Sequence, residues 1–345
     1  LILEAAIPPS IFLDPAICRG PYSAWCQMLR QLKAFVLVCH MWRDVGTDLL
    51  YRCVVIRRFG QLPALLRSLQ RDPKLGPMVC ELQINCFVPR GCRAVFEQGL
   101  AQLWPLCPNA TRLALDHQTD DTRGFPSVLD SMLPSIVELQ FGPDYSIQRA
   151  FPLLLQCTGL VALSITFGDY IGEADDIPFV VLESLEELHI SHTLWCHEPR
   201  KTDVCAIISK HCSLPRLRRL TAKLPPHSLM ANGRTLYRLL CAHGEELTHL
   251  STCFSVVPLQ EEVQKYLNLC PSLQHFSTNE HTGITRLSHP KLEYLDVWVL
   301  YFDSLIRVCV FDWRAHLPAL RMVRFLDSAL LSTAGARLPL VLPPD

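Results

Sequence analysis

One short apolar phrase recurs along most of this chain, and its spacing constrains the fold more than any single residue does. The phrase has the form apolar–x–x–apolar–x–apolar, as in "LCPNATRLAL" (106–115) and again in "LCPSLQHFST" (269–278). Successive copies begin 19 to 32 residues apart. Their first apolar residues are Val79, Ala110, Ile136, Leu160, Leu185, Leu217, Leu247, Leu273, Leu292 and Leu320.

This period favours a repeat architecture built from strand–helix pairs. Leucine-rich repeats run about 20–29 residues, whereas propeller blades need about 40–45 and helical tetratricopeptide repeats about 34. The chain departs from a standard leucine-rich repeat, because no regular Asn follows the predicted strands and two intervals are long. We therefore expect an α/β fold, in which a leucine-rich-repeat-like solenoid of about ten strand–helix repeats carries a parallel sheet on its concave face.

The alternation of side chains along a strand makes this expectation specific. Successive strand residues point to opposite faces, so the fourth and sixth residues of each phrase should point into the core. The residue between them should face the open, concave surface, and in no repeat is it large and apolar. These central residues are Gln83, Ala114, Gln140, Ser164, His189, Thr221, Ser251, Ser277, Asp296 and Arg324.

The sixteen cysteines are better explained by packing than by disulfide bonds. The chain is large and shows no secretory start, which argues against a disulfide framework. Cys107, Cys157 and Cys270 each lie three residues before the first apolar residue of a phrase. An unpaired Cys behaves as a small buried hydrophobe, so these three should pack at the turn between helix and strand.

Helical patterns fill most of the intervals. Residues 259–270 place Val263, Tyr266 and Leu267 on one face, as an amphipathic helix requires. Residues 233–244 show the same period and stop at a glycine, which is a common helix end.

The first part of the chain does not follow the repeat. Residues 24–56 carry apolar side chains three and four positions apart, which predicts an amphipathic helix, and Gly46-Thr47-Asp48 predicts a break in it. So short a helical piece forms a poor independent core and needs a neighbour or a partner to cover it. The predicted domains are a helical element at 1–58, a linker helix at 59–78, the solenoid at 79–336 and a tail at 337–345.

The segment "LKAFVLVCHMWRDVGTDLLYRCVVI" (32–56) resembles the second half of an F-box. Its most diagnostic stretch is Leu37-Val38-Cys39-His40-Met41-Trp42-Arg43, and Leu49-Leu50-Tyr51-Arg52 is the usual sequel. "LILEAAIPP" (1–9) resembles the tail of the first F-box helix without its start, which indicates a truncated beginning. Residues 59–84 are similar to the linker of many fungal F-box proteins with degenerate leucine-rich repeats. The resemblance covers residues 1–84, and the remainder is similar through its architecture only.

This resemblance implies a substrate receptor of a cullin–RING ubiquitin ligase, located in the cytoplasm or the nucleus. The F-box would dock on a Skp-type adaptor, and through it on cullin, while the solenoid holds a target protein. The chain itself would not be an enzyme, because its effect on the reaction is proximity. The residues carried over to adaptor binding are Leu3, Ile7, Pro8, Leu37, Val38, Cys39 and Trp42, for which packing within the helices is the competing interpretation.

The predicted concave surface offers a candidate patch for the target protein. Tyr, Trp and Arg are the residue types that anchor protein interfaces, and Tyr294, Trp298 and Arg324 come from the last three repeats. An ordinary solvated sheet surface is the alternative. The full candidate set is His189, His249, His275, Tyr294, Asp296, Trp298 and Arg324.

Several other kinds of site find little support in the sequence. The chain has no G-x-S-x-G, G-x-x-x-x-G-K-[ST] or H-E-x-x-H motif, so we predict neither catalytic residues nor a cofactor. The His and Cys residues between 192 and 212 lack the tight pairs of a structural zinc site, so we predict no metal.

Charge and hydropathy argue against two classes of partner. A formal net charge of −1 is not the basic excess of a nucleic-acid-binding protein. The apolar runs are far shorter than the roughly 20 residues that a membrane span needs.

Two alternatives to the ligase interpretation stay open. One is a protein-interaction scaffold whose degenerate F-box no longer binds an adaptor. The other is a regulator of GTPases in the manner of leucine-rich-repeat activators, which would call for a strongly acidic flank. Residues 71–345 hold 24 basic and 29 acidic residues and show no such flank.

Overall fold

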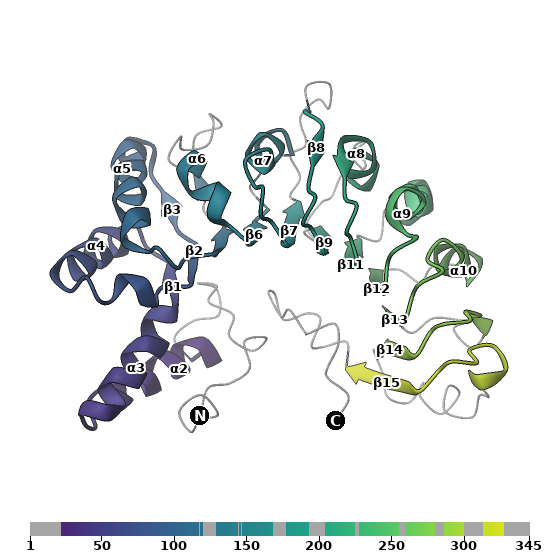
Figure 1. Cartoon of the computed structure of the whole chain (residues 1–345), viewed down its shortest axis with the longest axis horizontal. Coiled ribbons are helices and arrows are strands. Elements are labelled where there is room, and N and C mark those ends of the chain that lie inside the picture. Colours follow the sequence, from purple (N-terminus) through teal and green to yellow (C-terminus); the bar gives the residue numbers. More distant parts are fainter. Residues whose placement is uncertain are drawn as a thin grey trace. The chain divides into compact units, whose positions relative to one another are not determined.

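The fold is α/β, with a large parallel sheet of eleven strands, as the sequence predicts at this level (Figure 1). The described residues fall into two compact units, unit 1 (22–143) and unit 2 (145–327). None of the helices among these residues is long and apolar enough to cross a membrane. The computed structural model describes residues 22–116, 118–119, 129–143, 145, 147–167, 177–192, 204–224, 228–254, 260–279, 286–299 and 313–327.

Unit 1 begins with two helices joined by a tight turn, α2 (Ala24–Phe35) and α3 (His40–Arg52). The predicted break at Gly46 is wrong, because the chain turns at residues 36–38 and α3 continues through Gly46. A Cβ atom at Gly46 would lie 2.8 Å from Val36 Cγ1. The glycine therefore permits close packing of α3 against the end of α2 instead of ending a helix.

Four parallel strands follow one another across unit 1. Cys53–Ile56 belongs to the sheet as its first strand, which corrects the prediction of a helical element there. Its residues Cys-Val-Val-Ile include the β-branched types that suit a strand. The strands pair in the order β1 (Cys53–Ile56), β2 (Glu81–Ile84), β4 (Arg112–Leu115) and β6 (Glu138–Phe141), and β3 (Phe87–Val88) pairs separately with β5 (Gln118–Thr119).

After α2 and α3, the helices of unit 1 lie in the intervals between these strands. A helix at Gln61–Arg71 lies within the segment 59–78, where the sequence predicts a linker helix, and Leu62, Leu66 and Leu69 form its buried side. The helices are α4 (Gln61–Arg71), α5 (Arg93–Leu103) and α6 (Leu129–Met132), with short 3-10 helices at Gly76–Met78, Arg90–Cys92, Trp104–Leu106 and Leu133–Ser135.

Unit 2 continues the same pattern with longer strands. Seven parallel strands pair in chain order, and Figure 1 shows α7 to α10 on one side of them. The helices predicted near 233–244 and 259–270 are confirmed as parts of α9 and α10. The strands are β7 (Ala162–Phe167), β9 (Glu187–His192), β11 (Arg219–Leu224), β12 (His249–Phe254), β13 (His275–Asn279), β14 (Tyr294–Val299) and β15 (Met322–Asp327).

The other elements of unit 2 are four α-helices, one short helix and a small two-stranded pairing. They are α7 (Ile147–Leu154), α8 (Val204–His211), α9 (Ser228–His243), α10 (Gln260–Asn268), the 3-10 helix Trp313–Ala315, and β8 (Val180–Val181) paired with β10 (Cys212–Ser213).

The strand register agrees with the column of central residues predicted from the sequence. The residues that flank this column point into the core: Leu163 is 4% exposed and Ile165 is 1% exposed. We name the opposite side of the unit 2 sheet the polar face. Its central residues pair in the order Ser164, His189, Thr221, Ser251, Ser277, Asp296 and Arg324, and in unit 1 Gln83, Ala114 and Gln140 pair likewise.

The cysteines at the helix–strand turns are packing residues, as predicted. Cys107 and Cys157 are 3% exposed and Cys270 is fully buried. Burial raises the pKa of Cys107 to about 11 and the pKa values of Cys157 and Cys270 to about 12. The thiols therefore stay protonated at neutral pH and fill space as apolar groups.

Other residues at the same turn position bring successive segments of backbone together. A Cβ atom at Gly244 would lie 2.5 Å from the carbonyl oxygens of both Leu240 and Leu269. His289 Nε2 donates to the carbonyl oxygen of Cys270 at 3.0 Å. Residue size at this position therefore controls how closely one turn approaches the next.

One helix side chain also joins neighbouring segments. The Gln264 amide donates from Nε2 to the carbonyl oxygen of Ser288 at 2.8 Å, and its Oε1 accepts from the Ser288 N–H at 2.9 Å. This pair of hydrogen bonds fixes α10 against the segment that precedes β14.

Gly244→Ala should lower the free energy of unfolding by about 3 kcal/mol, because the added methyl group would press on two backbone carbonyls that cannot rotate away. Chemical denaturation followed by circular dichroism measures the change. Gly159→Ala is the matched control, since a Cβ there meets nothing within 4 Å. The control should change stability by less than about 0.5 kcal/mol, and equal effects would contradict the packing role of Gly244.

Candidate protein-interaction surfaces

The turn between α2 and α3 presents a group of exposed apolar side chains. Leu37 is 82% exposed, Met41 72%, Val38 61% and Val45 42%. Met41 and Val45 are one helical turn apart on α3 and so share a face. We name these four residues the apolar tip, and exposed apolar groups that gather in this way mark interaction sites.

The helices beneath the apolar tip are held by local packing. Phe35 and Trp42 meet edge to face, with ring centroids 5.5 Å apart, and Leu32 is almost fully buried. Ser23 caps α2 by accepting a hydrogen bond from the Cys26 N–H at 3.3 Å. The tip is thus displayed on a supported pair of helices.

The structure places the predicted adaptor-binding residues in different environments. Leu37, Val38 and Cys39 are exposed, whereas Trp42 is half-buried against Phe35 and so contributes to packing. Met41 and Val45 were missed by the sequence analysis, although their spacing of four and their position outside the buried stripe could have indicated them. Leu3, Ile7 and Pro8 lie outside the described residues.

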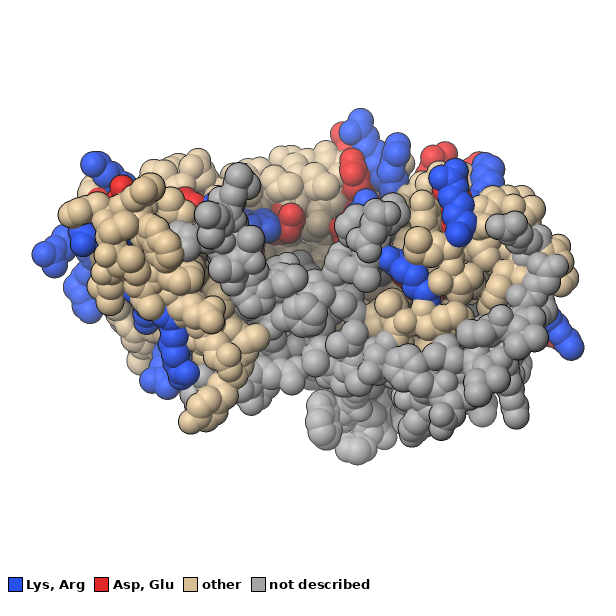
Figure 2. All heavy atoms as spheres, turned by 90° about the horizontal axis from the view of Figure 1, so that it is seen from below, with Lys and Arg blue, Asp and Glu red and all other residues tan. Residues whose placement is uncertain are grey.

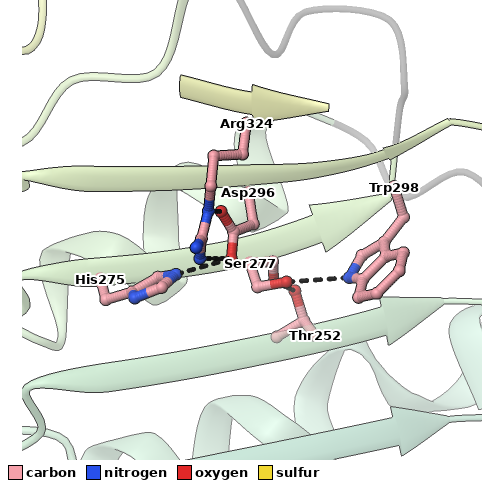
Figure 3. Close-up of polar contacts among 6 residues, drawn as sticks. All are labelled: Thr252, His275, Ser277, Asp296, Trp298 and Arg324. Carbon is pink, nitrogen blue, oxygen red and sulfur yellow. Dashed lines mark hydrogen bonds and ion pairs between the residues drawn. The ribbon is translucent and has the colours of Figure 1, made fainter. Parts of the chain in front are cut away.

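The polar face of unit 2 contains a buried ionic cluster on three adjacent strands (Figure 3). Arg324 donates from Nε to Asp296 Oδ1 and from a terminal nitrogen to Oδ2, both at 2.6 Å. His275 Nε2 lies 2.8 Å from Asp296 Oδ2. Asp296 is 2% exposed and His275 3%, so the cluster is shielded from solvent.

The charge of Asp296 is stabilised by its two neighbours. Burial alone would raise the pKa of this carboxyl group, but the hydrogen bonds and charges of His275 and Arg324 together lower the pKa below its ordinary value. An ionised Asp296 accepts from His275, which assigns the Nε2 proton to the imidazole. Asp296 therefore fixes the tautomer of His275 and the position of the Arg324 guanidinium.

A second set of contacts lies beside the cluster. Trp298 Nε1 donates to Ser277 Oγ at 2.9 Å, and Thr252 Oγ1 donates to the Ser277 carbonyl oxygen at 3.5 Å. Figure 3 shows the Trp298 indole reaching toward Ser277 from the neighbouring strand. Trp298 is 5% exposed and Ser277 3%, so this tryptophan packs within the protein.

Three rings form a row across β12, β13 and β14. The centroids of His249 and His275 are 5.6 Å apart, and those of His275 and Tyr294 are 5.8 Å apart. Burial in the first place, together with the positive charge of Arg219 and the neighbouring His275, lowers the pKa of His249 to about 4. His249 is therefore neutral at pH 7.

The expectation that the central column faces an open surface is wrong for its small and acidic members. Ser251, Ser277 and Asp296 are each less than 5% exposed. Among the predicted target-binding residues, His275, Asp296 and Trp298 are likewise buried and engaged with protein groups. The remaining four, His189, His249, Tyr294 and Arg324, are half-buried and stay candidates for contact with a partner.

Neither a protein-family model nor a curated protein sequence matches this chain. Among the described residues, no group of three or more His, Cys, Asp or Glu side chains is arranged to hold a metal ion.

Asp296→Ala should destabilise the protein by about 3–5 kcal/mol, because it leaves the buried His275 and the half-buried Arg324 without their acceptor. Asp48→Ala is the matched control: it removes an ion pair with Arg52 whose side chains are 43% and 45% exposed. The control should cost at most about 0.5 kcal/mol. Urea unfolding measures both, and a small cost for Asp296→Ala would mean that the cluster adds nothing to stability.

The neutral state of His249 should make the stability of unit 2 sensitive to acid. The unfolded chain binds a proton at His249 near pH 6.5, whereas the folded chain binds it only near pH 4. The free energy of unfolding should therefore fall as the pH drops through this window, by on the order of 1 kcal/mol after allowance for partial exposure. His249→Gln should reduce the slope, and an unchanged slope would contradict the assignment.

Proposed function

We propose that this chain is the substrate-recognition subunit of an SCF-type cullin–RING ubiquitin ligase. The helices of unit 1 act as an F-box that docks on a Skp-type adaptor. The strand–helix segments act as a leucine-rich-repeat-like solenoid that binds a target protein. The ligase chemistry is carried out elsewhere in the assembly, and this chain contributes proximity between the target and the ubiquitin-charged enzyme.

The observation that carries this proposal is the exposure of the apolar tip. Leu37 and Val38 belong to the stretch that resembles an F-box, and they are 82% and 61% exposed. Apolar side chains at a helix turn cost free energy when left in water, by up to about 1.5–3 kcal/mol for each large residue. A partner with an apolar groove would recover that free energy, which is the role that the resemblance gives to an adaptor.

The strand pairing supports the second half of the proposal. Neighbouring strands of the sheet within each unit pair in parallel and in one register, and helices lie in several of the intervals between them. Repeats of this kind display side chains from many strands on one continuous surface, which suits the binding of a protein segment.

The proposal is tested by a pull-down of a purified fungal Skp-type adaptor with this chain and with Leu37→Asp/Met41→Asp. Both residues are exposed, so the variant should keep its fold, and circular dichroism checks this. We expect the variant to weaken adaptor binding by at least about 30-fold, because the loss of a central apolar contact typically removes about 2 kcal/mol or more.

A matched control separates the tip from apolar exposure in general. Val95 on α5 is 62% exposed, and Val95→Asp should leave adaptor binding unchanged. If the folded wild-type chain does not bind the adaptor, the ligase proposal fails and an interaction scaffold without an adaptor becomes the better description.

A further inference from the structure

A basic pair lies on the polar face at β11 and β12. Arg219 and His249 occupy paired positions on these strands. Arg219 is exposed, and among the described residues no ion pair joins it to Glu187, its partner in register on β9. The positive charge of Arg219 acts on His249, since it is one of the causes that lower the pKa of that imidazole.

Among the described residues, neither Glu187 nor Asp296, the acidic groups near this pair, forms an ion pair with Arg219. Asp296 is already engaged by Arg324 and His275 on the neighbouring strands. Figure 2 shows the Lys and Arg side chains of the visible surface in small separate groups, without one broad basic field. The positive charge of Arg219, beside the neutral His249, is therefore a local feature, suited to a single anionic group.

We propose that Arg219 and His249 receive a carboxylate side chain of an acidic segment of the target protein. This inference rests on the proposed function, because it names the chemistry of the segment that the solenoid binds. A carboxylate matches the planar guanidinium of arginine, with which it can form two parallel hydrogen bonds.

The orientation of His249 also suits a carboxylate ligand. His249 Nδ1 lies 2.7 Å from Thr248 Oγ1, which fixes the ring and leaves Nε2 as the nitrogen available to a ligand. A protonated His249 would donate from Nε2 to an anion. Without an anion the proton is disfavoured, because burial, Arg219 and His275 all oppose it.

Binding should therefore be coupled to proton uptake. The groups that face His249 are Arg219 on β11 and His275 on β13. Beyond them lie Glu187 on β9, Tyr294 and Asp296 on β14, and Arg324 on β15. An added carboxylate is the component that favours the charged ring, and an opposite charge within about 4–6 Å typically raises such a pKa by 1–3 units. The affinity should accordingly rise as the pH falls.

The experiment uses the whole chain and a fluorescein-labelled Gly-Ser peptide that carries several Glu residues, with its Gln counterpart as the neutral probe. Fluorescence anisotropy at about pH 7.5 and about pH 5 gives the dissociation constants. We expect the Glu peptide to bind at least about 10-fold more tightly than the Gln peptide. Its affinity should rise about tenfold at the lower pH, which corresponds to a rise of about two units in the pKa of His249 on binding.

Two variants make the result specific to the site. Arg219→Gln should weaken binding of the Glu peptide by at least about 10-fold, and His249→Gln should remove the pH dependence. Arg218→Gln is the matched control, since it removes the same charge from an adjacent exposed residue outside the paired strand. It should leave the affinity unchanged within about twofold.

Three outcomes would overturn the inference: equal binding of the two peptides, equal effects of Arg218→Gln and Arg219→Gln, or a pH dependence that survives in His249→Gln. No binding of the Glu peptide by the folded chain would also overturn it. Adaptor binding measured on the same samples is independent of this result. If the chain binds the adaptor but not the Glu peptide, only the carboxylate site is refuted. If it binds the Glu peptide but not the adaptor, the adaptor proposal is refuted.

Discussion

The structure depends on holding short strands in a single register. The strands are four to six residues long in most cases, so each has only two or three side chains that point into the core. A shift by one residue would exchange Leu163 with Ser164 and turn the apolar side chains to the other face. Burial of one leucine contributes about 2 kcal/mol, so a slipped strand would lose several kcal/mol.

The same alternation places polar side chains on the polar face, where those that are buried need hydrogen-bond partners. Where the sheet buries a polar side chain, the group must find a hydrogen bond or destabilise the fold. In β13, β14 and β15, Asp296 finds partners in His275 and Arg324, and Ser277 finds one in Trp298, whereas the buried His275 Nδ1 has no hydrogen-bond partner within the described part of the chain. The polar face thus differs along its length: these internal contacts lie at one end, while Arg219 at β11 is exposed.

Much of the sheet was predictable from the sequence because its signal is local. The column from Ser164 to Arg324 follows from period 2 within each phrase and needs no knowledge of the neighbouring strand. The pairing of Asp296 with His275 and Arg324 was not predictable in this way, since 21 and 28 residues separate the partners. Only the paired register brings them together, and so their burial could not be seen in the sequence.

The errors near the start of the chain have a similar origin. Glycine is a residue type that often interrupts helices, but the role of Gly46 is set by its contact with Val36, at the end of α2. The four residues of β1 are apolar without alternation, which cannot distinguish a buried strand from the end of a helix. For the candidate surfaces, the resemblance indicated Leu37 and Val38, whereas the exposure of Met41 required the orientation of α3 to be known.

The hydrogen bonds that join successive turns have a consequence for how such chains diverge. His289 reaches the Cys270 carbonyl, and Gln264 holds Ser288, across the shortest interval of the repeat. These contacts and the strand pairing set the spacing of the sheet. The segments that connect successive strands can therefore change in length without changing that spacing. Descendants of one ancestor can then retain the same surface while insertions and deletions accumulate between strands. Similarity in sequence would fade well before similarity in shape.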